Sequence, residues 1–527
     1  MSEAWIIDAV RSPRGKGKET GALHNVHPQR ILAQVLNALQ QRNGFDTAEV
    51  DDVIMGCGAG SGDHSMDIAR MAALDAGWSI QAPGVTLNRF CGSGQQAVNF
   101  ASMGILAGFQ DMVVAGGVES MSRPAPMHVD GFTANNNHLR DQYDMVPQGI
   151  SADLIASVEG FSREELDQLA VDSQNRAAEA IAEGRFERSL VPIFHDDGTL
   201  ALDHDEHPRA GTTLADLAKL APAFAGMGNH TMGGRELTID ETARNAYPHI
   251  GEIRHVHHGG NSSGVVDGAA AVLLTSPEYA RAHGYTPRAK VTMAAVAGDE
   301  PVIMLTAPGP AARLVVQKAG MTLDDIDLFE VNEAFAAVLL KFLRDTGVPW
   351  DKVNVNGGAM ALGHPIGATG AMLIGTLLDE LERRDLQTGL VTMCTGGGMA
   401  TATIIERISG RAPIAHNQRF ATASNTTASA ALGPFDSARR CAAVATKRSC
   451  IRPTWAADAA TNAADPHAGN LVASLGTHPV AVGAGTPRHL QGGLVASVRD
   501  TQPVRRQPCR CAVSSVVSCR AVVLPTY

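Results

Sequence analysis

Short apolar runs separated by amphipathic segments dominate two parts of the chain, the first 120 residues and the stretch from residue 290 to residue 408. The apolar runs predict buried strands over residues 4–10, 52–58, 84–87, 111–117, 291–296, 328–331, 353–356, 389–393 and 400–407. Apolar residues at helical spacing predict helices over residues 27–39, 65–77 and 309–319, after residue 91, and up to about residue 382. This alternation predicts an α/β fold with right-handed βαβ units on a mostly parallel sheet.

The two parts resemble each other in the order of their elements. In the first part, the apolar run at residues 85–88 leads to Cys91 and then to a helix. In the second part, the run at residues 353–356 leads to His364 and then to a helix. A duplicated domain with pseudo-twofold symmetry would bring Cys91 and His364 together where the halves meet. We expect a shared site there, because ligand sites favour such interfaces.

Cys91 lies where a predicted strand turns sharply into a predicted helix. A thiol at that position faces the positive end of the helix macrodipole, which favours the thiolate. Gly92 and Gly94 leave room for a substrate to approach the backbone. The arrangement resembles a nucleophile elbow with sulfur in place of oxygen. The alternative is a buried structural cysteine, the commoner role of a free thiol.

Two further parts of the chain differ from these in composition. Residues 121–260 contain polar loops, several helical pieces such as residues 163–183, and many His, Pro and Asn, which indicates an insertion suited to substrate contacts. Residues 411–527 contain 12 Arg, one Lys, four Asp and no Glu, against 30 basic and 50 acidic residues before them. This tail has no sustained hydrophobic period. It resembles an out-of-frame translation or a disordered appendage, with a further folded domain as the alternative.

Composition and charge exclude several functional classes. The chain is 44% hydrophobic and 18% charged, which is typical of a globular protein. The formal net charge of −11 argues against a general nucleic-acid binder. No apolar run is long enough for membrane insertion, and the first residues lack a basic segment followed by an apolar one. We therefore expect a cytoplasmic protein.

The cysteines and histidines do not indicate a metal site. Three of the eight cysteines, Cys57, Cys91 and Cys394, precede the tail, and no Cys or His cluster has zinc spacing. Cys57 is interpreted as a small core residue. The adjacent pair His257 and His258 lies in a predicted loop, and adjacent residues rarely converge on one ion, so both are interpreted as solvated or supporting side chains.

Four separated motifs carry the candidate chemistry. They are Cys91 in NRFCGSG, Asn332 in NEAFA, His364 in GGAMALGHPIGATG, and Cys394 in CTGGGM. Together with the opening IIDAVRSPRGKGK they resemble the thiolase family from residue 5 to about residue 408. The resemblance implies a duplicated βα fold with two similar core domains, layered α-β-α-β-α, and an inserted loop domain. It also implies a homodimer or homotetramer.

The resemblance assigns a role to each residue of this constellation. Cys91 would be the nucleophile that attacks the 3-keto carbon of a 3-oxoacyl-CoA, and His364 would accept its proton. Cys394 would be the general acid and base. Asn332 would hold a water that, with His364, stabilises the enolate oxygen. The backbone N–H groups of Cys91 and Gly396 would hold the tetrahedral oxyanion.

The resemblance also implies contacts with coenzyme A, which we expect as a co-substrate and not as a permanently bound cofactor. Ser263, in the sequence Asn261-Ser262-Ser263-Gly264, matches a family serine near the pantetheine arm. Arg209 matches an arginine near the adenine and phosphate end, and its alternative is an ordinary solvated arginine. Met145 belongs to the loop usually written HMG-x-TAE, which here lacks the His and is longer between Met and Gly.

The same comparison divides the chain into expected domains. Residues 1–120 plus 265–287 would form the N-terminal core domain, residues 121–264 the inserted domain, residues 288–408 the C-terminal core domain, and residues 409–527 the tail. The altered loop and the longer stretch from residue 224 to residue 261 both lie in the insertion. They favour a degradative 3-ketoacyl-CoA thiolase, active in fatty-acid or related acyl-CoA breakdown, over an enzyme that forms acetoacetyl-CoA.

Two further functional classes remain as alternatives. A decarboxylating ketosynthase shares the fold but resembles a Cys-His-His set, whereas this chain has Cys394 at the third position and Asn332 in addition. A non-catalytic acyl-CoA-binding member of the fold would be expected to lack one of Cys91, His364 or Cys394, and the chain has all three.

Overall fold

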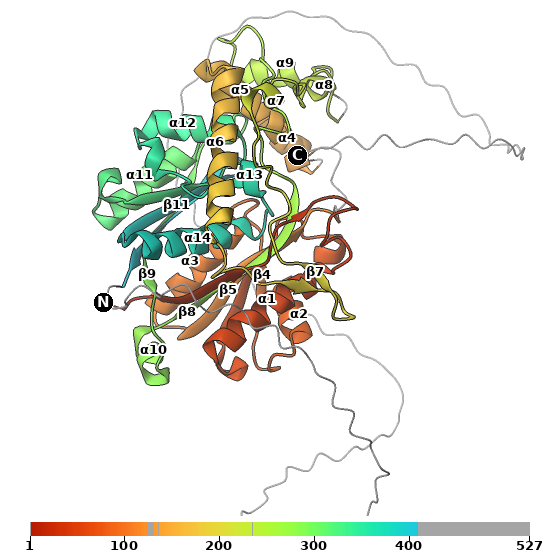
Figure 1. Cartoon of the computed structure of the whole chain (residues 1–527). Helices are drawn as coiled ribbons and strands as arrows, with labels where there is room; N and C mark the ends of the chain where they lie inside the picture. Colours follow the sequence, from red (N-terminus) through yellow and green to blue (C-terminus); the bar gives the residue numbers. More distant parts are fainter. Residues whose placement is uncertain (1, 124–130, 135, 234, 409–527) are drawn as a thin grey trace, which may run out of the picture. The chain divides into compact units, whose positions relative to one another are not determined.

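The main feature of the structure is a mixed sheet that runs through both halves of the chain (Figure 1). The computed structural model describes residues 2–123, 131–134, 136–233 and 235–408. Among them, the sheet contains, in spatial order, β10 (Leu328–Val331), β11 (Thr388–Thr395), β12 (Met399–Arg407), β9 (Ala289–Gly298), β1 (Trp5–Arg11), β8 (Val266–Thr275), β5 (Met112–Ser120), β3 (Asp52–Gly56) and β4 (Val85–Leu87). The short β2 (Gly15–Lys16) pairs with β8, and β6 (Ile193–Phe194) pairs with β7 (Leu200–Leu202).

The strand order is symmetric about the pair formed by β1 and β9. These two strands pair antiparallel at only two positions, Trp5 with Lys290 and Ile6 with Ala289. Moving outward, β8, β5 and β3 on one side correspond to β12, β11 and β10 on the other. The edge strand β4 corresponds to Val353, which makes an isolated parallel bridge to Phe329. The duplication expected from the sequence is therefore present in the strand order.

The sheet is not mostly parallel, so that prediction was wrong. Only the β10–β11, β3–β4 and β3–β5 pairs are parallel, whereas every pair between β5 and β11 through the centre is antiparallel. The cause is β8 and its counterpart β12, which return antiparallel beside β5 and β11. The sequence analysis did not identify β8, and residues 353–356 form a turn with one bridge in place of the expected strand.

Helices and sheet form five layers, because helices pack on both faces of each half of the sheet (Figure 1). The outer layers contain α1 (Pro28–Asn43) and α2 (Ile68–Asp75) on one side and α11 (Pro308–Ala319) and α12 (Ala336–Thr346) on the other. The middle layer contains α3 (Ser93–Leu106) and α14 (Thr369–Arg384), packed against each other between the two half-sheets. Each interface has its own apolar cluster, as expected when every helix buries one stripe against a sheet face.

The segment between the halves supplies most of the remaining elements. The helices in this segment are α4 (Asn137–Gln142), α5 (Gln148–Glu159), α6 (Arg163–Ala182), α7 (Leu214–Leu217), α8 (Ala225–Gly228) and α9 (Ile239–Ala246). The helices α10 (Pro277–His283) and α13 (Ala359–Leu362) belong to the halves themselves. The start of α6 is fixed by a capping box, in which Ser162 and Glu165 satisfy each other's backbone N–H groups. Short 3₁₀ turns cover Thr47–Glu49, Gly62–His64, Gly131–Thr133, Leu323–Asp325 and Trp350–Lys352.

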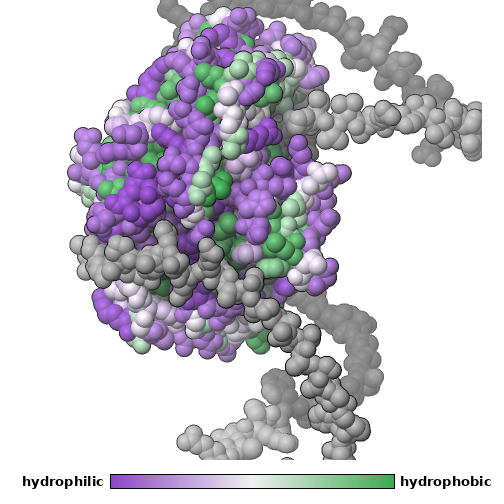
Figure 2. All heavy atoms as spheres, viewed as in Figure 1, coloured by the Kyte–Doolittle hydropathy of each residue, from purple (hydrophilic) through white to green (hydrophobic). Residues whose placement is uncertain are grey.

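Hydrophilic residues dominate the face of the molecule seen in Figure 2, with a narrow band of hydrophobic residues across its middle. Within the described ranges, no helix combines the length and the apolar character needed to cross a membrane. The predictions made for the tail at residues 409–527 lie outside the described residues. The expected domain boundaries stay a prediction.

Candidate active site

The turn that carries Cys91 is held by hydrogen bonds of its own side chains. The Phe90 N–H donates to Asn88 Oδ1 at 2.8 Å, and the Ser93 hydroxyl donates to the Phe90 carbonyl at 2.6 Å. Phe90 has a φ of 48°, in the left-handed region that a side chain with a Cβ rarely adopts. Cys91 follows this residue directly, and α3 begins at Ser93. The sequence predicted this sharp strand-to-helix turn, and Phe90 supplies the strained backbone typical of a nucleophile elbow.

His364 is fixed by hydrogen bonds that also decide its tautomer. Its backbone N–H donates to the Gly264 carbonyl at 2.8 Å, and its Nδ1 lies 2.5 Å from Thr369 Oγ1. The Thr369 hydroxyl donates its own hydrogen to the Pro365 carbonyl, at 2.8 Å. Thr369 Oγ1 must therefore accept from Nδ1–H, since a hydroxyl has only one hydrogen. The Nε2 of His364 is therefore unprotonated, as a proton acceptor requires.

Two glycines let the segments of Cys91 and His364 pack backbone to backbone. A Cβ built on Gly94 would lie 2.6 Å from the Gly367 carbonyl oxygen, and one built on Gly370 would lie 2.3 Å from the Gln95 nitrogen. Larger residues at either position would force the starts of α3 and α14 apart. The structure therefore brings the turn of Cys91 against the segment after His364, as the duplication predicted.

The buried carboxylate of Glu119 supports the same junction. It accepts the N–H groups of Gly58 at 2.7 Å, Ala59 at 3.0 Å and Gly367 at 2.9 Å. Burial raises the pKa of Glu119 to about 7 in spite of these donors. This carboxylate thus links the loop after β3 to the segment after His364.

Asn332 lies beside the unprotonated nitrogen of His364. Its Nδ2 donates to His364 Nε2 at 3.4 Å, and its backbone N–H donates to the Thr392 carbonyl at 3.1 Å. Its side-chain oxygen is buried and has no hydrogen-bond partner among the described residues. Buried polar atoms are normally hydrogen-bonded, and a water or a substrate group would supply the missing donor here.

Cys394 and Gly396 come to Cys91 from the end of β11. Both thiols are buried, and Cys394 is close enough to Cys91 for a charge on one to disfavour a charge on the other. The backbone N–H groups of Gly396 and of Cys91 itself lie close enough to the Cys91 sulfur to lower its pKa. A Cβ built on Gly396 would lie 2.6 Å from the Phe132 ring, which explains the glycine there. The five residues expected in the catalytic constellation thus come from segments that meet.

Burial raises the pKa of Cys91 to about 11, which contradicts the expectation that the helix start favours a thiolate. Hydrogen bonds from Gln148 and from backbone N–H groups lower the pKa of Cys91, and they are outweighed. Burial also raises the pKa of Cys394, and it lowers that of His364 to about 3, with Arg14 adding to the effect. The macrodipole acts mainly within the first turn, and Cys91 precedes that turn. The resting site therefore contains two neutral thiols and a neutral imidazole.

Alkylation of Cys91 should report this neutral resting state directly. Because only the thiolate reacts and its fraction grows with pH below the pKa, the iodoacetamide rate at Cys91 should rise about tenfold per pH unit between pH 7 and 9. The rate is measured by peptide mass spectrometry over that range, with Cys57 as the internal reference for unfolding. A plateau that begins near pH 6 would instead indicate a preformed thiolate–imidazolium pair.

Gln148 is a site residue that the sequence analysis missed. It begins α5, and its side chain hydrogen-bonds to the Cys91 sulfur. The signal available in the sequence was the altered loop at residues 144–153, which was noted for its missing histidine and its greater length but not for Gln148. A neutral amide against the nucleophile leaves the charge of the site unchanged and can orient the thiol.

The residues expected to contact coenzyme A fall into two groups. Ser263 is half-buried and donates its N–H to the Ala334 carbonyl at 2.8 Å, next to Gly264, on which His364 is anchored. Arg209 is exposed, and its backbone N–H donates to Gln174 Oε1 at 2.8 Å. The structure thus brings Ser263 to the site, whereas no described contact joins the Arg209 side chain to it.

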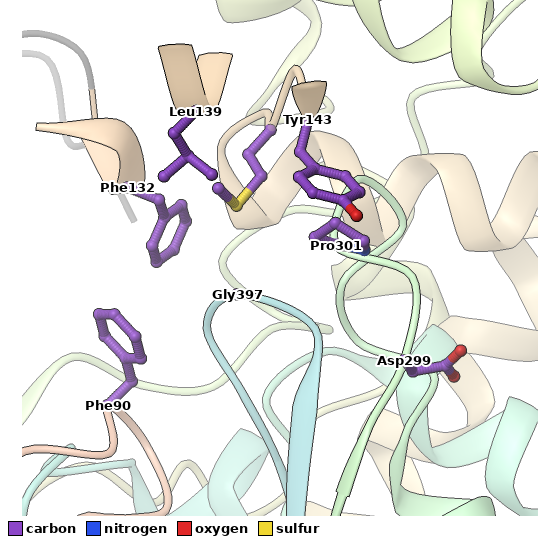
Figure 3. A pocket seen from close by; sticks show the side chains of 8 residues that line it. Phe90, Phe132, Leu139, Tyr143, Asp299, Pro301 and Gly397 are labelled. Carbon is purple, nitrogen blue, oxygen red and sulfur yellow. The ribbon is translucent and has the colours of Figure 1, made fainter. Parts of the chain in front are cut away.

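A cavity of about 370 Å³ opens beside Phe90 and Gly397, next to the residues of the constellation (Figure 3). The rings of Phe90 and Phe132 meet edge to face, with their centroids 5.4 Å apart. The lining residues are Phe90, Phe132, Leu139, Tyr143, Met145, Asp299, Pro301 and Gly397. Met145, expected as a coenzyme A contact, therefore lines a mostly apolar cavity.

His257 and His258 are not solvated, so of the two interpretations the structure supports the second, that they are supporting side chains. Both are buried, with His257 Nδ1 2.7 Å from Asp153 and His258 Nε2 2.8 Å from Asp167. The two aspartates belong to α5 and α6 and are themselves buried. A buried carboxylate needs donors, so the histidine pair ties the loop before β8 to these two helices.

Comparison with known proteins finds two family models in succession along the chain. "Thiolase, N-terminal domain" matches residues 4–240 and "Thiolase, C-terminal domain" matches residues 285–407. A steroid 3-ketoacyl-CoA thiolase of Mycobacterium tuberculosis is 40% identical over 77% of this chain and 95% of its own length. A β-ketoadipyl-CoA thiolase of Pseudomonas aeruginosa is also 40% identical, over 77% and 99%. The crystal structure of an acetyl-CoA acetyltransferase of Bacillus anthracis is similar with a TM-score of 0.65 and 36% identity, over 77% of this chain and 99% of that one.

Proposed function

The chain belongs to the thiolase family, and from this premise we propose that it catalyses CoA-dependent thiolytic cleavage of a 3-oxoacyl-CoA. The products are acetyl-CoA and an acyl-CoA shorter by two carbons. The observation that carries the proposal is the meeting of the segments that bear two thiols, Cys91 and Cys394, and an imidazole whose Nε2 is unprotonated. One thiol suits the covalent step and the other suits proton transfer.

In the first half-reaction, the Cys91 sulfur attacks the 3-keto carbon and its proton passes to His364 Nε2. Since the resting thiol has a raised pKa and the imidazole a lowered one, this proton moves during the attack and not before it. The bond between C2 and C3 of the substrate then breaks. The electron pair goes to the acetyl-CoA enolate, which Cys394 protonates.

In the second half-reaction, Cys394 takes the proton of the incoming CoA thiol. The CoA sulfur attacks the acyl group on Cys91, and the sulfur of Cys91 leaves and takes back its proton from His364 Nε2. The N–H groups of Cys91 and Gly396 already face the nucleophilic sulfur, which supports their role as donors to the oxyanion in both half-reactions. The unpartnered oxygen of Asn332 supports a bound water at the enolate oxygen.

Condensation of two acetyl-CoA molecules is the reverse of this reaction and would use the same groups. The relatives named for cleavage of larger 3-oxoacyl groups favour cleavage for this chain. The cavity beside Phe90 supports the same direction, because an acetyl group would leave it empty. The test is thiolysis of 3-oxoacyl-CoAs of graded chain length, followed at the 3-oxoacyl-CoA absorbance. Activity on acetoacetyl-CoA alone would contradict the proposal.

Coenzyme A acts here as a co-substrate, with Ser263 beside the pantetheine arm and Arg209 as a surface cation for the phosphates. The position of Ser263 next to the anchor of His364 supports the first contact. The exposed side chain of Arg209 is compatible with the second. The three described cysteines are free thiols, which supports a reducing compartment such as the cytoplasm.

We also propose that the protein forms a homo-oligomer, at least a dimer. The strand β4 is at the edge of the sheet, where unpaired backbone groups favour association. Large apolar side chains on this strand, on α3 and on the adjoining turns are exposed, which is unusual for a surface that faces only water. They are Ile80, Val85, Phe100, Met103, Leu106 and Phe109.

Sedimentation should therefore show a dimer or a larger assembly. A charge placed among these apolar side chains, as in Met103→Glu, should weaken the assembly, because it would be buried without a partner. The matched control is Ile181→Glu, at an equally exposed position on α6, which should leave the assembly intact. An active protein that sediments only as a monomer would contradict this part of the proposal.

A further inference from the structure

The cavity beside Phe90 and Gly397 is lined by apolar side chains and one acidic side chain. Its described lining contains two phenylalanines, Leu139, Met145 and Pro301, with the Tyr143 hydroxyl as its only uncharged side-chain hydrogen-bonding group and Asp299 as its only charged one. Figure 3 shows the Phe90 and Phe132 rings facing each other across from the Gly397 turn, and the Asp299 carboxylate directed away from them. None of the described lining residues is basic.

The basic residues nearest in sequence to the lining residues contact other groups. Arg89 extends its guanidinium to the Met399 sulfur, at 3.9 Å. Arg140 donates to the Gly233 carbonyl at 3.0 Å, and Arg235 pairs with Asp144. The sequence of residues 124–130, which precedes Phe132, contains neither Lys nor Arg.

The acidic groups, in contrast, lie close to the lining. Asp299 accepts from the Thr306 hydroxyl at 2.7 Å and from the Glu300 N–H at 2.9 Å, so its carboxylate is held in place. Asp144 follows Tyr143 in the sequence, and its charge is paired with Arg235. A carboxylate brought into the cavity would therefore lose water, find no basic side chain in the described lining and meet the charge of Asp299, and each of these effects opposes binding.

The cavity also adjoins the Cys91 sulfur, which would attack the 3-keto carbon. Phe132 packs on Gly396, whose N–H faces the Cys91 sulfur, and Phe90 precedes Cys91 in the chain. The part of the acyl group beyond the 3-keto carbon would thus extend past these rings into the cavity. We infer that the acyl groups cleaved by this protein are neutral and apolar along their length and do not end in a carboxylate. The inference rests on the proposed thiolytic function and names its substrate class.

The direct test compares two 3-oxoacyl-CoAs with six-carbon chains, 3-oxohexanoyl-CoA and β-ketoadipyl-CoA, which differ in the terminal carboxylate. The neutral substrate should have the higher kcat/KM by at least ~100-fold, the size expected when a polar group is left unpaired. Equal kcat/KM values, or a preference for β-ketoadipyl-CoA, would overturn the inference and leave thiolysis intact. Cleavage of neither substrate, with no acyl group on Cys91, would contradict the proposed function itself.

Two variants locate the origin of the preference. Tyr143→Lys places a cation in the lining at a half-exposed position, and Asp299→Asn removes the negative charge while it keeps an acceptor for Thr306. Each should shift the kcat/KM ratio toward β-ketoadipyl-CoA, the first by about tenfold or more. The control Ile181→Lys, exposed on α6, should leave the ratio unchanged. An unchanged ratio in both lining variants would overturn the inference, because the terminal carboxylate would then be bound elsewhere.

Discussion

Cys91→Ala should abolish the acyl-enzyme and lower the rate of thiolysis by at least about 10⁴-fold, the scale on which loss of a covalent nucleophile acts in enzymes. The reason is that no neighbouring group can replace the bond. Cys394 is the nearest thiol, and burial together with the Cys91 sulfur raises its pKa further from the neutral range. The measurement is steady-state thiolysis of 3-oxohexanoyl-CoA by the full-length variant.

Cys57→Ala is the matched control for this variant. Cys57 is also a buried free thiol, and burial beside Glu119 raises its pKa to about 12. It contacts the Glu119 carboxylate, with the sulfur 3.9 Å from Oε1, and does not belong to the constellation. This variant should keep its acyl-enzyme. Loss of acylation in Cys57→Ala with retention in Cys91→Ala would reverse the assignment of the nucleophile.

Cys394→Ala should slow both half-reactions by roughly 10²–10⁴, the usual contribution of general acid–base catalysis. The covalent step does not need Cys394, so an acyl group should still accumulate on Cys91 when acyl-CoA is supplied without free CoA. Single-turnover acylation and deacylation, measured separately, test this division. If Cys394→Ala lost acylation as completely as Cys91→Ala, the proton-transfer role of Cys394 would be wrong.

The duplication and the sharp turn at Cys91 could be predicted from the sequence because both depend on local patterns. The apolar runs at residues 84–87 and 353–356 precede Cys91 and His364 in the same order, and Gly94 and Gly370 allow the close packing of the helices that follow. The strand directions could not be predicted. The strand β8 is rich in small residues, and its antiparallel pairing with β1 and β5 depends on contacts far along the chain.

The positions of the candidate residues followed from the motifs, but their charge states did not. The helix start at Cys91 suggested a thiolate, whereas burial of the whole site raises the thiol pKa and lowers that of His364. Burial is set by residues from several segments, so no local pattern reveals it. The same applies to Gln148, which reaches Cys91 only because α5 begins beside the turn, and to the buried histidines at 257 and 258.

The most direct test of the central claim, that Cys91 carries the acyl group, is peptide mass spectrometry of the quenched protein after exposure to acyl-CoA without free CoA. Wild type and Cys394→Ala should both show the acyl mass on the peptide that contains Cys91, and Cys91→Ala should show it on no cysteine. An acyl group on Cys394 while Cys91 stays unmodified would contradict the account.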